Sequence, residues 1–236
     1  VKNVNFVADA STLVKGDSFI WSGEALGTNL RYPDNLTVEN CTFEAVASRA
    51  INTTVVGVQV KASKNLVVKN CTAKNIHSLL QAQSCDESVL VQNCTVNGKN
   101  GVAFKQVKSA KVEGTTIVAS GYGIRFDGNT DNYGIVVKNN KVTALQPLIV
   151  RKMTGANNTI TLEGTNELNT TEDYQIVVTN GSDDAEYVKP TGTYTLTGAD
   201  NYTIFPEPYP VATWSELTAA LAAGEENIKL TADITY

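Results

Sequence analysis

The feature that most constrains the fold of this chain is a short stretch that recurs along it. The stretch reads Leu-Thr-Val-Glu-Asn-Cys-Thr-Phe at residues 36–43 and returns, with few changes, at residues 66–73 and 90–96. Looser copies occupy residues 111–117 and 136–142, and the chain begins at Val1 inside another copy. A unit that recurs about every 20 to 50 residues is typical of a solenoid, in which successive units stack on one another.

The asparagine of this stretch gives the repeat its register. The equivalent positions are Asn3, Asn40, Asn70, Asn93, Gly114, Asn139 and Gly164, at intervals of 37, 30, 23, 21, 25 and 25 residues. Each copy is followed by a second run with period-two alternation, such as residues 101–105, which predicts a half-buried strand. No helical run separates the strands, so βαβ units are not expected. The pattern predicts a triangular coil in which one asparagine per turn adopts the left-handed conformation and bonds to its equivalent in the next coil.

These features resemble the right-handed parallel β-helix proteins of the pectate-lyase-like superfamily. The resemblance covers residues 1–165. It implies an all-β fold, a right-handed parallel β-helix or solenoid, in which short strands of neighbouring coils pair. It does not imply one activity, because this scaffold carries lyases, hydrolases, esterases, phage tailspikes and non-enzymatic adhesins.

The repeat breaks after residue 165. Residues 166–206 contain strand-like runs separated by turn residues and are predicted to form a C-terminal β capping region. Residues 207–236 read as a linker, a short helix that begins with a capping box at Thr213 and Glu216, and a strand over residues 228–234. This helix and strand are similar to the N-terminal opening of a β-helix module, although here they stand at the end of the sequence.

Three arrangements would use this terminal segment. Residues 211–236 could begin the next copy in a tandem array, could complete the open end of a neighbouring subunit in a head-to-tail fibre, or could fold back onto the chain's own first coil. The first two make neighbouring copies of the protein its partners. The apolar residues expected at the contact between modules are Val1, Val4, Phe6, Trp214, Leu217, Leu221, Ile228, Leu230 and Ile234.

Composition narrows the class of partner. The formal net charge is -5 and no basic cluster is present, so nucleic-acid binding is not expected. No apolar run approaches the roughly 18 residues of a membrane span, so membrane insertion is not expected. Val1 is not followed by a signal-peptide core, which fits a cytosolic chain, a processed chain or a segment of something longer. The β-helix resemblance favours an extracellular or cell-surface bacterial protein.

Three of the four cysteines, Cys41, Cys71 and Cys94, occupy the same position in the repeat. Stacking at about 4.8 Å would place their thiols in a column. The spacing does not match paired zinc ligands. We expect small buried side chains, with a disulfide that involves Cys85 as the alternative.

Four charged residues are candidates for catalysis, namely Lys105, Arg125, Asp127 and Arg151. Lys105, Asp127 and Arg151 should share one column on the outer face of the second strands, with Arg125 beside it, and Leu80 and Ala82 should face outward one coil earlier. A polysaccharide lyase needs a base that abstracts the proton beside a uronate carboxylate and a cation that neutralises that carboxylate, and Lys and Arg can serve in these roles. The alternative is a solvated ladder in which Asp127 offsets the repulsion between two cations.

Aromatic residues give a second candidate site. Trp21 and Tyr32 flank a long insertion, and Tyr122 and Tyr133 flank the strand that carries Asp127, so these rings could stack on sugars. Core and loop packing is the alternative. Several Asn-x-Thr triplets, including those at Asn40 and Asn70, match glycosylation sequons, but we expect these asparagines to be buried in the ladder.

No cofactor is expected and the sequence predicts no metal site. Asp127, Asn129 and Asp131 alternate as the ligands of calcium loops do, but the loop lacks the turn glycine and the distal glutamate. An Asn/Asp-rich turn is therefore the preferred interpretation, and a bound calcium the alternative.

The sequence thus predicts a secreted or surface-displayed bacterial β-helix protein with a structural or adhesive role, assembled head-to-tail or in a tandem array. The alternative is a polysaccharide lyase or a glycan-binding module that acts on uronate-containing glycans. The sequence does not decide whether the protein is an enzyme.

Overall fold

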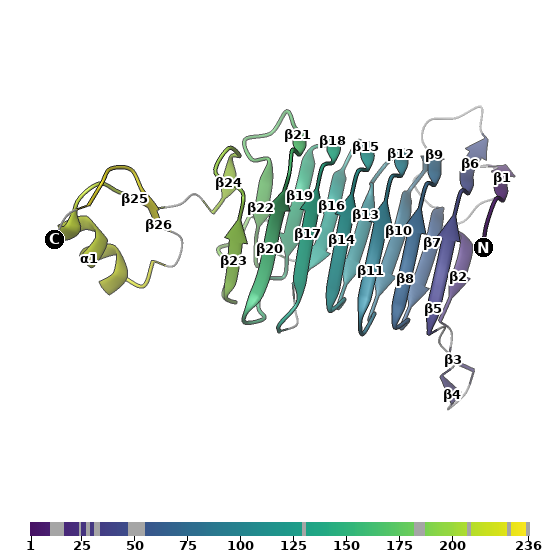
Figure 1. Ribbon diagram of the computed structural model, residues 1–236, viewed down its shortest axis with the longest axis horizontal. Helices are drawn as coiled ribbons and strands as arrows, with labels where there is room; N and C mark the ends of the chain where they lie inside the picture. Colours follow the sequence, from purple (N-terminus) through teal and green to yellow (C-terminus); the bar gives the residue numbers. More distant parts are fainter. Residues whose placement is uncertain are drawn as a thin grey trace.

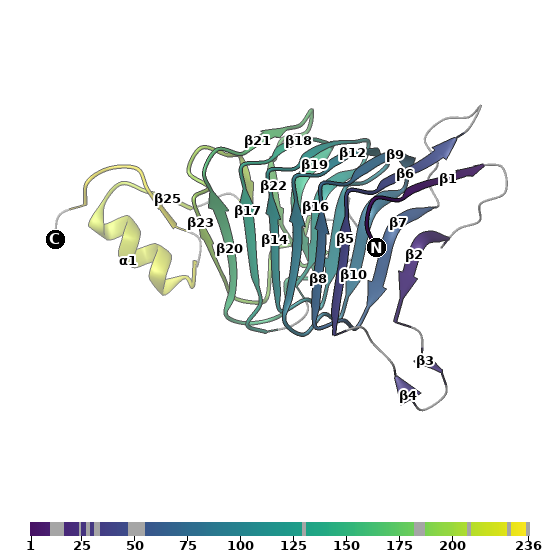
Figure 2. The same ribbon diagram turned by 45° about the vertical axis from the view of Figure 1, so that its right-hand side comes forward.

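The computed structural model shows a parallel β-solenoid of about six turns, followed by a small C-terminal unit (Figure 1). The structure describes residues 1–9, 17–23, 25–26, 29–30, 34–46, 55–128, 131–181, 187–206, 209–225 and 228–234. Three parallel sheets, here named A, B and C, enclose the interior, and the turned view in Figure 2 shows the successive coils stacked along one axis. The predicted all-β, right-handed parallel β-helix is confirmed.

Each coil contributes one strand to each sheet, in the order A, B, C, except that among the described residues the first coil has no strand in sheet A and the last has none in sheet B. Sheet A contains β5 (Asn35–Glu39), β8 (Asn65–Lys69), β11 (Ser88–Gln92), β14 (Ser109–Glu113), β17 (Gly134–Lys138), β20 (Asn158–Glu163) and β23 (Tyr194–Thr197). Sheet B contains β1 (Asn5–Asp9), β6 (Thr42–Val46), β9 (Thr72–Ile76), β12 (Thr95–Gly98), β15 (Thr116–Ala119), β18 (Lys141–Thr143) and β21 (Glu167–Asn169). Sheet C contains β2 (Ser18–Ser22), β7 (Val56–Lys61), β10 (Ser78–Gln83), β13 (Val102–Lys105), β16 (Tyr122–Asp127), β19 (Gln146–Arg151), β22 (Ile176–Val178) and β24 (Ile204–Phe205).

The recurring asparagine makes the corner between sheets A and B. Asn3, Asn40, Asn70, Asn93 and Asn139 have φ between 53° and 58°. The Nδ2 group of Asn40 donates to Oδ1 of Asn3 at 3.1 Å, and Nδ2 of Asn70 donates to Oδ1 of Asn40 at 3.2 Å. The predicted left-handed ladder is therefore present.

One expectation about this ladder was wrong. The side chains of Asn40, Asn70 and Asn93 are exposed rather than buried. The turn projects from the corner of the coil, so the amides bond to one another at the surface. Burial therefore does not exclude glycosylation at these sequons.

A second left-handed turn ends the strands of sheet C. Ala62, Ser84, Gln106 and Lys152 have φ between 53° and 56°. These residue types rarely adopt this conformation, so nothing in the sequence indicated the turn. Both corners have the same physical role, because a left-handed residue reverses the chain without interrupting the pairing of the next strand.

The interior column next to the asparagine turn consists of cysteines in the first coils and of polar side chains in the later ones. Cys41, Cys71 and Cys94 are buried, and the thiols of Cys71 and Cys94 donate to the carbonyl oxygens of Lys69 and Gln92 at 3.2 and 3.3 Å. All four cysteines are free and buried, so the structure contains no disulfide among them. The neighbouring Cys71 thiol and burial raise the pKa of Cys94, and burial raises the pKa of Cys85.

The same column continues in polar side chains. Thr115 Oγ1 accepts from the Cys94 N–H at 3.3 Å, and Asn140 Oδ1 accepts from the Thr115 N–H at 2.9 Å. Asn166 Oδ1 then accepts from the Asn140 N–H at 3.0 Å. Buried polar groups of this kind require hydrogen-bond partners in the fold. Here the side chain in each coil accepts a hydrogen bond from the backbone N–H of the coil before it.

The strands of residues 166–206 join the same three sheets. β21, β22, β23 and β24 each pair with the preceding strand of their own sheet. The coils therefore extend beyond residue 165, and we revise the predicted boundary between the helix and a separate cap. The repeat is lost in the sequence because these strands are short, with three, three, four and two residues.

Residues 209–234 form a distinct C-terminal unit beyond the last coil. β25 (Tyr209–Val211) and β26 (Ile228–Leu230) pair in parallel, and α1 (Trp214–Ala222) connects them. The capping box is present: Thr213 Oγ1 accepts from the Glu216 N–H and the Glu216 carboxylate accepts from the Thr213 N–H. A further hairpin pairs β3 (Ala25–Leu26) with β4 (Asn29–Leu30).

The C-terminal unit lies at the opposite end of the solenoid from the N-terminus (Figure 1). The arrangement in which this segment folds back onto its own first coil is therefore not adopted. The final strand is also shorter than expected, because pairing with β25 ends at Leu230.

Candidate functional site

Two columns of side chains run along the outer face of sheet C, one residue per coil. The first follows the register Trp21, Gln59, Gln81, Ala103, Arg125 and Ile149. The second follows Lys61, Gln83, Lys105, Asp127 and Arg151. Adjacent members of a column are about 4.8 Å apart, the spacing of paired strands.

These columns form a groove over the first coils. Its volume is about 300 Å³. It is lined by Trp21, Gln59, Val60, Lys61, Gln81, Ala82, Gln83, Ala103, Phe104, Lys105 and Arg125. The structure therefore brings together one residue predicted to stack on a sugar, Trp21, and two predicted to act in catalysis, Lys105 and Arg125.

Trp21 stands at the N-terminal end of the groove, with 47% of its surface exposed. β2 continues into Gly23, where φ is +110° and a Cβ atom would collide with the carbonyl oxygen of Lys61. Only glycine permits this close approach, which brings the chain that follows Trp21 against β7. The indole is thus held beside the polar side chains of the groove.

The groove is positively charged although the chain as a whole is acidic. Lys61 and Lys105 form no ion pair with any residue that the structure describes. Arg125 lies over the Tyr122 ring, 4.5 Å from its centroid, and its Nε is 3.8 Å from Asp127 Oδ1. Three cations therefore line this groove, and the nearest carboxylate is at its C-terminal margin.

A buried amide oxygen lies on the groove floor. Gln59 Oε1 is buried and has no hydrogen-bond partner among the described residues. A buried acceptor without a partner is unfavourable by about 1–3 kcal/mol.

Asp127 and Arg151 are bound to each other rather than directed into the groove. Asp127 is only 2% exposed, and Arg151 Nε donates to its Oδ1 at 2.7 Å. Asp127 therefore lies between the cations of Arg125 and Arg151, and it is buried rather than solvated as the ladder interpretation expects. With Arg151 bound to its Oδ1 and its side chain buried, the Asp127 carboxylate is not directed towards a ligand in the groove.

Two of the three tyrosines predicted to bind a ligand are not available to one. Tyr122 and Tyr133 are both 2% exposed. Tyr133 stacks on Phe126 with centroids 4.4 Å apart, and its hydroxyl donates to Met153 Sδ at 3.5 Å. Burial raises the pKa of the Tyr133 hydroxyl. Tyr122 and Tyr133 are therefore packing residues, contrary to the prediction that they bind a ligand. Tyr32 lies outside the described residues.

Gln81 and Gln83 belong to the groove but were missed in the sequence. Leu80 and Ala82 were expected to face outward, and both are buried instead. Leu79 and Leu80 are both buried, so the apolar pattern does not show which of them aligns with the inward residues Val58 and Val102, and pairing shows that it is Leu80. Counting back 22 residues from Lys105 to Gln83, one coil, would have given the correct register.

The residues of the suggested calcium loop have separate partners. Asp127 binds Arg151, whereas Asp131 Oδ1 accepts from the Ala156 N–H at 2.7 Å. Asn129 lies outside the described residues. In the part of the chain that the structure describes, no group of three or more His, Cys, Asp or Glu side chains is placed to hold a metal ion.

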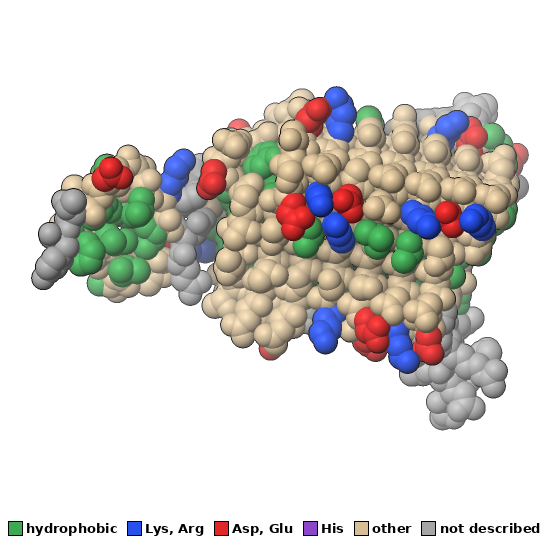
Figure 3. Space-filling view, in the orientation of Figure 1, with side chains coloured by type: hydrophobic (Ala, Val, Ile, Leu, Met, Phe, Trp, Pro, Cys, Tyr) green, Lys and Arg blue, Asp and Glu red, His purple; other side chains and the backbone are tan. Residues whose placement is uncertain are grey.

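The apolar residues expected at module contacts lie at the two ends of the molecule. Val1, Val4, Trp214, Leu221 and Leu230 are 49%, 37%, 44%, 60% and 58% exposed. The others, Phe6, Leu217, Ile228 and Ile234, are partly buried. Figure 3 shows hydrophobic side chains gathered on the C-terminal unit. Among the described helices, none has the length and apolar character required to cross a membrane.

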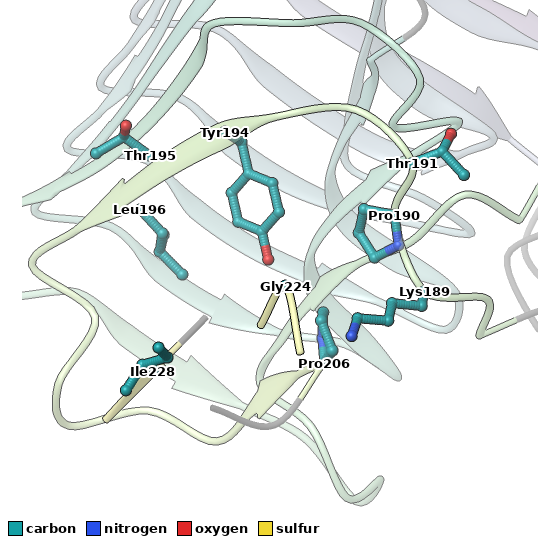
Figure 4. A pocket seen from close by; sticks show the side chains of 9 residues that line it. All are labelled: Lys189, Pro190, Thr191, Tyr194, Thr195, Leu196, Pro206, Gly224 and Ile228. Atoms are coloured by element: carbon teal, nitrogen blue, oxygen red, sulfur yellow. The ribbon is translucent and has the colours of Figure 1, made fainter. Parts of the chain in front are cut away.

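A second cavity separates the last coil from the C-terminal unit. It has a volume of about 470 Å³ and is lined from β23 by Tyr194 and Leu196 and from the unit by Gly224 and Ile228. In Figure 4 the Tyr194 ring points into this space, towards Gly224 and Pro206. The ion pair of Lys189 with Glu225, at 3.0 Å, crosses between the two parts.

Comparison with known proteins identifies the scaffold. A family model described as the right-handed beta helix region matches residues 4–117. The matched segment includes the strands β5 to β14 and most of the groove residues. No match was found among curated proteins or among solved structures.

Proposed function

Because this chain is a right-handed β-helix protein, we propose that it is an adhesive module that binds an acidic polysaccharide in the groove of sheet C. The observation that carries this proposal is the combination of three cations and an exposed indole in one groove of an acidic protein. Uronate carboxylates would pair with the cations, and a sugar ring would stack on Trp21. Such a role is expected outside the cell or on the surface of a bacterium.

The length of the groove suits a polymer rather than a single sugar. Lys61 and Lys105 are two coils apart, which corresponds to about 10 Å along the solenoid. An extended acidic chain that lies parallel to the solenoid axis could present successive carboxylates to both lysines. The amides of Gln81 and Gln83 lie on the strand between these two lysines and could bond to sugar hydroxyls.

Binding rather than cleavage is the function that this groove supports best. A lyase requires a group that abstracts the proton beside the carboxylate, while the bond to the leaving sugar oxygen breaks. Asp127 and Arg151 are engaged with each other, and Lys105 and Arg125 are the predicted catalytic residues that remain in the groove. Their cationic groups favour recognition of a carboxylate.

The test compares polygalacturonate with neutral dextran by isothermal titration calorimetry. We expect binding to polygalacturonate alone, weakened by added salt. Lys61→Met and Lys105→Met should each weaken binding about tenfold, as should Trp21→Ala. Lys99→Met, which removes an exposed cation outside the groove, is the matched control and should bind normally.

Three results would overturn this proposal. They are the absence of binding, equal affinity for dextran, and unchanged affinity in both lysine variants. The appearance of unsaturated uronate ends during incubation with polygalacturonate would replace the binding role with a lyase.

A second proposal concerns assembly. The exposed apolar residues at the two ends of the solenoid favour head-to-tail contact between copies, in which the C-terminal unit of one copy covers β1 and β2 of the next. A contact between two different surfaces does not close, so it would produce open filaments. Electron microscopy of the full chain at high concentration tests this. Filaments that are lost on deletion of residues 209–236 are expected, and single particles throughout would contradict it.

A further inference from the structure

The outer face of sheet A carries a regular row of charges. In-register pairing places Glu39, Lys69, Gln92, Glu113, Lys138 and Glu163 in one column, one residue per coil. Lys2, which is bridged to Glu39, adds a seventh member at the N-terminal end. Figure 3 shows this row as acidic and basic side chains that alternate across the face, with a gap at its middle.

Neighbouring charges in the row pair with each other. Lys2 and Lys69 lie 3.2 and 3.3 Å from the carboxylate of Glu39. Lys138 lies 3.5 Å from Glu113 and 3.7 Å from Glu163. At the centre, Gln92 Nε2 donates to Glu113 at 3.3 Å. The row is thus held in order along the face rather than spread into solvent.

The order of charges along the row is antisymmetric about Gln92. From the N-terminal end the row reads positive, negative, positive, neutral, negative, positive, negative. Read from the other end, every charged position has the opposite sign. A two-fold axis that runs parallel to the strands through Gln92 therefore superposes each charge of one copy on an opposite charge of a second copy.

We propose that the outer face of sheet A pairs with the same face of a second copy of this chain, with the two solenoids antiparallel. The charge complementarity of the row selects this partner. Lys2 would oppose Glu163, Glu39 would oppose Lys138, and Lys69 would oppose Glu113, each contact being made twice. Gln92 would meet Gln92 on the axis. An interface in which one surface contacts itself closes as a dimer.

The adjacent column is compatible with this packing. Its members are Thr37, Val67, Leu90, Lys111, Val136 and Thr161. Leu90 would meet Leu90 beside the axis, and Val136 would meet Thr37. Lys111 would oppose Val67, where its aliphatic stem can cover the valine while its ammonium group remains 3.0 Å from Glu113 of its own chain.

The charges along the loop edge of this face do not share the symmetry. Asp34, Lys64, Glu87 and Lys108 are all exposed, and the pair of Lys64 with Asp34, at 3.1 Å, has side-chain exposures of 55% and 69%. They would form the rim of the interface, where solvent and salt screen them. The column centred on Gln92 lies at the other, C-terminal end of the strands, where Glu39, Lys69, Glu113 and Lys138 are half-buried.

The size of the face sets the strength of the contact. Six strand spacings by five residues give about 30 Å by about 17 Å, or on the order of 500 Å² per copy. The total of about 1,000 Å² is at the lower limit of specific interfaces. The dimer should therefore be reversible, concentration-dependent and sensitive to salt.

Charge-reversal variants test the pairing. Lys69→Glu alone would place a second carboxylate opposite Glu113, and Glu113→Lys alone would place a second ammonium group opposite Lys69. Analytical ultracentrifugation should show dimers of the natural chain at low salt. The dissociation constant of the dimer should be about tenfold or more higher for each variant. An equimolar mixture of the two variants should recover the dimer, because the opposing side chains are again of opposite sign.

Circular dichroism establishes whether each variant remains folded. If both are folded and their mixture stays monomeric while the natural chain dimerises, this arrangement is wrong. A natural chain that is monomeric at every concentration at low salt also overturns it.

Crosslinking tests the position of the axis. Packed sheets are about 10 Å apart, beyond the roughly 7 Å that a disulfide can span, so a short bis-maleimide is the suitable reagent. Gln92→Cys should be joined into dimers, since the four natural cysteines are buried. Thr161→Cys, on the same face but far from the axis, is the control and should not be joined. Equal crosslinking of both variants would contradict the proposed register.

Discussion

At the residue scale, the solenoid depends on a few side chains that hold backbone groups inside the coil corner. Asn140 is 2% exposed and bonds to the coils on both sides of its own. Its Oδ1 accepts from the Thr115 N–H at 2.9 Å, and its Nδ2 donates to the Val112 carbonyl oxygen at 2.8 Å. The cysteines at equivalent positions bond to carbonyl oxygens through weaker thiol donors. A small side chain at this corner position is therefore tolerated only where the neighbouring backbone groups have another hydrogen-bond partner.

Replacement of Asn140 should be among the costly single changes in this chain. Asn140→Ala leaves a buried N–H and a buried carbonyl without their partners, so the free energy of unfolding should fall by about 2–4 kcal/mol. Urea denaturation followed by circular dichroism measures this. Asn97→Ala, at an exposed position of β12, is the control and should change stability by less than about 0.5 kcal/mol. Equal effects at the two positions would refute the role given to Asn140.

At the element scale, the charges of sheet A link neighbouring strands. The ammonium groups of Lys2 and Lys69 hold the pKa of Glu39 below its ordinary value of 4.5. Lys111 and Lys138 hold the pKa of Glu113 below the same value. A carboxylate whose pKa is lower in the folded state stabilises the fold at neutral pH. That contribution is lost as the pH falls through the folded-state pKa.

The ladder predicts an acid-sensitive part of the stability. The free energy of unfolding should decrease as the pH falls below 4.5, because Glu39 and Glu113 must be protonated. Lys69→Met removes one partner of Glu39, so its stability should depend less on pH over this range. Urea denaturation at a series of pH values gives the comparison, with Lys99→Met as the control outside the ladder. A pH dependence that Lys69→Met leaves unchanged would count against the ladder.

At the scale of the whole molecule, the solenoid and the C-terminal unit are nearly independent. β25 and β26 pair only with each other among the described strands. The ion pair between Lys189 and Glu225 has side-chain exposures of 67% and 29%, and exposed pairs of this kind contribute about 0–1 kcal/mol. The cavity beside Tyr194 further limits the contact between the two parts.

Removal of residues 209–236 should therefore leave the solenoid folded. We expect the free energy of unfolding of the remaining coils to change by less than about 2 kcal/mol, since an exposed ion pair and a limited apolar contact are lost. Thermal unfolding followed in the far ultraviolet measures this. Loss of the cooperative transition would show that the unit acts as a necessary cap on β23 and β24.

The sequence by itself determined the coil. The repeated Asn-Cys-Thr stretch specifies a strand, a left-handed corner and a second strand, and these are local conformations that neighbouring residues dictate. Stacking of such units follows, because no single coil can bury its apolar face alone. The Thr213 capping box was equally readable, since all its bonds lie within four residues.

Only the tertiary structure decided which side chains meet. Trp21 and Arg125 share a groove because the register of five strands places them there. In β10 the two buried leucines, Leu79 and Leu80, hid that register in the sequence. Tyr122 and Tyr133 looked accessible in the sequence but are covered by other parts of the chain. The order of charges along sheet A was likewise decided by the coil. Neighbouring members of the row are 21 to 37 positions apart in the sequence, and strand pairing aligns them.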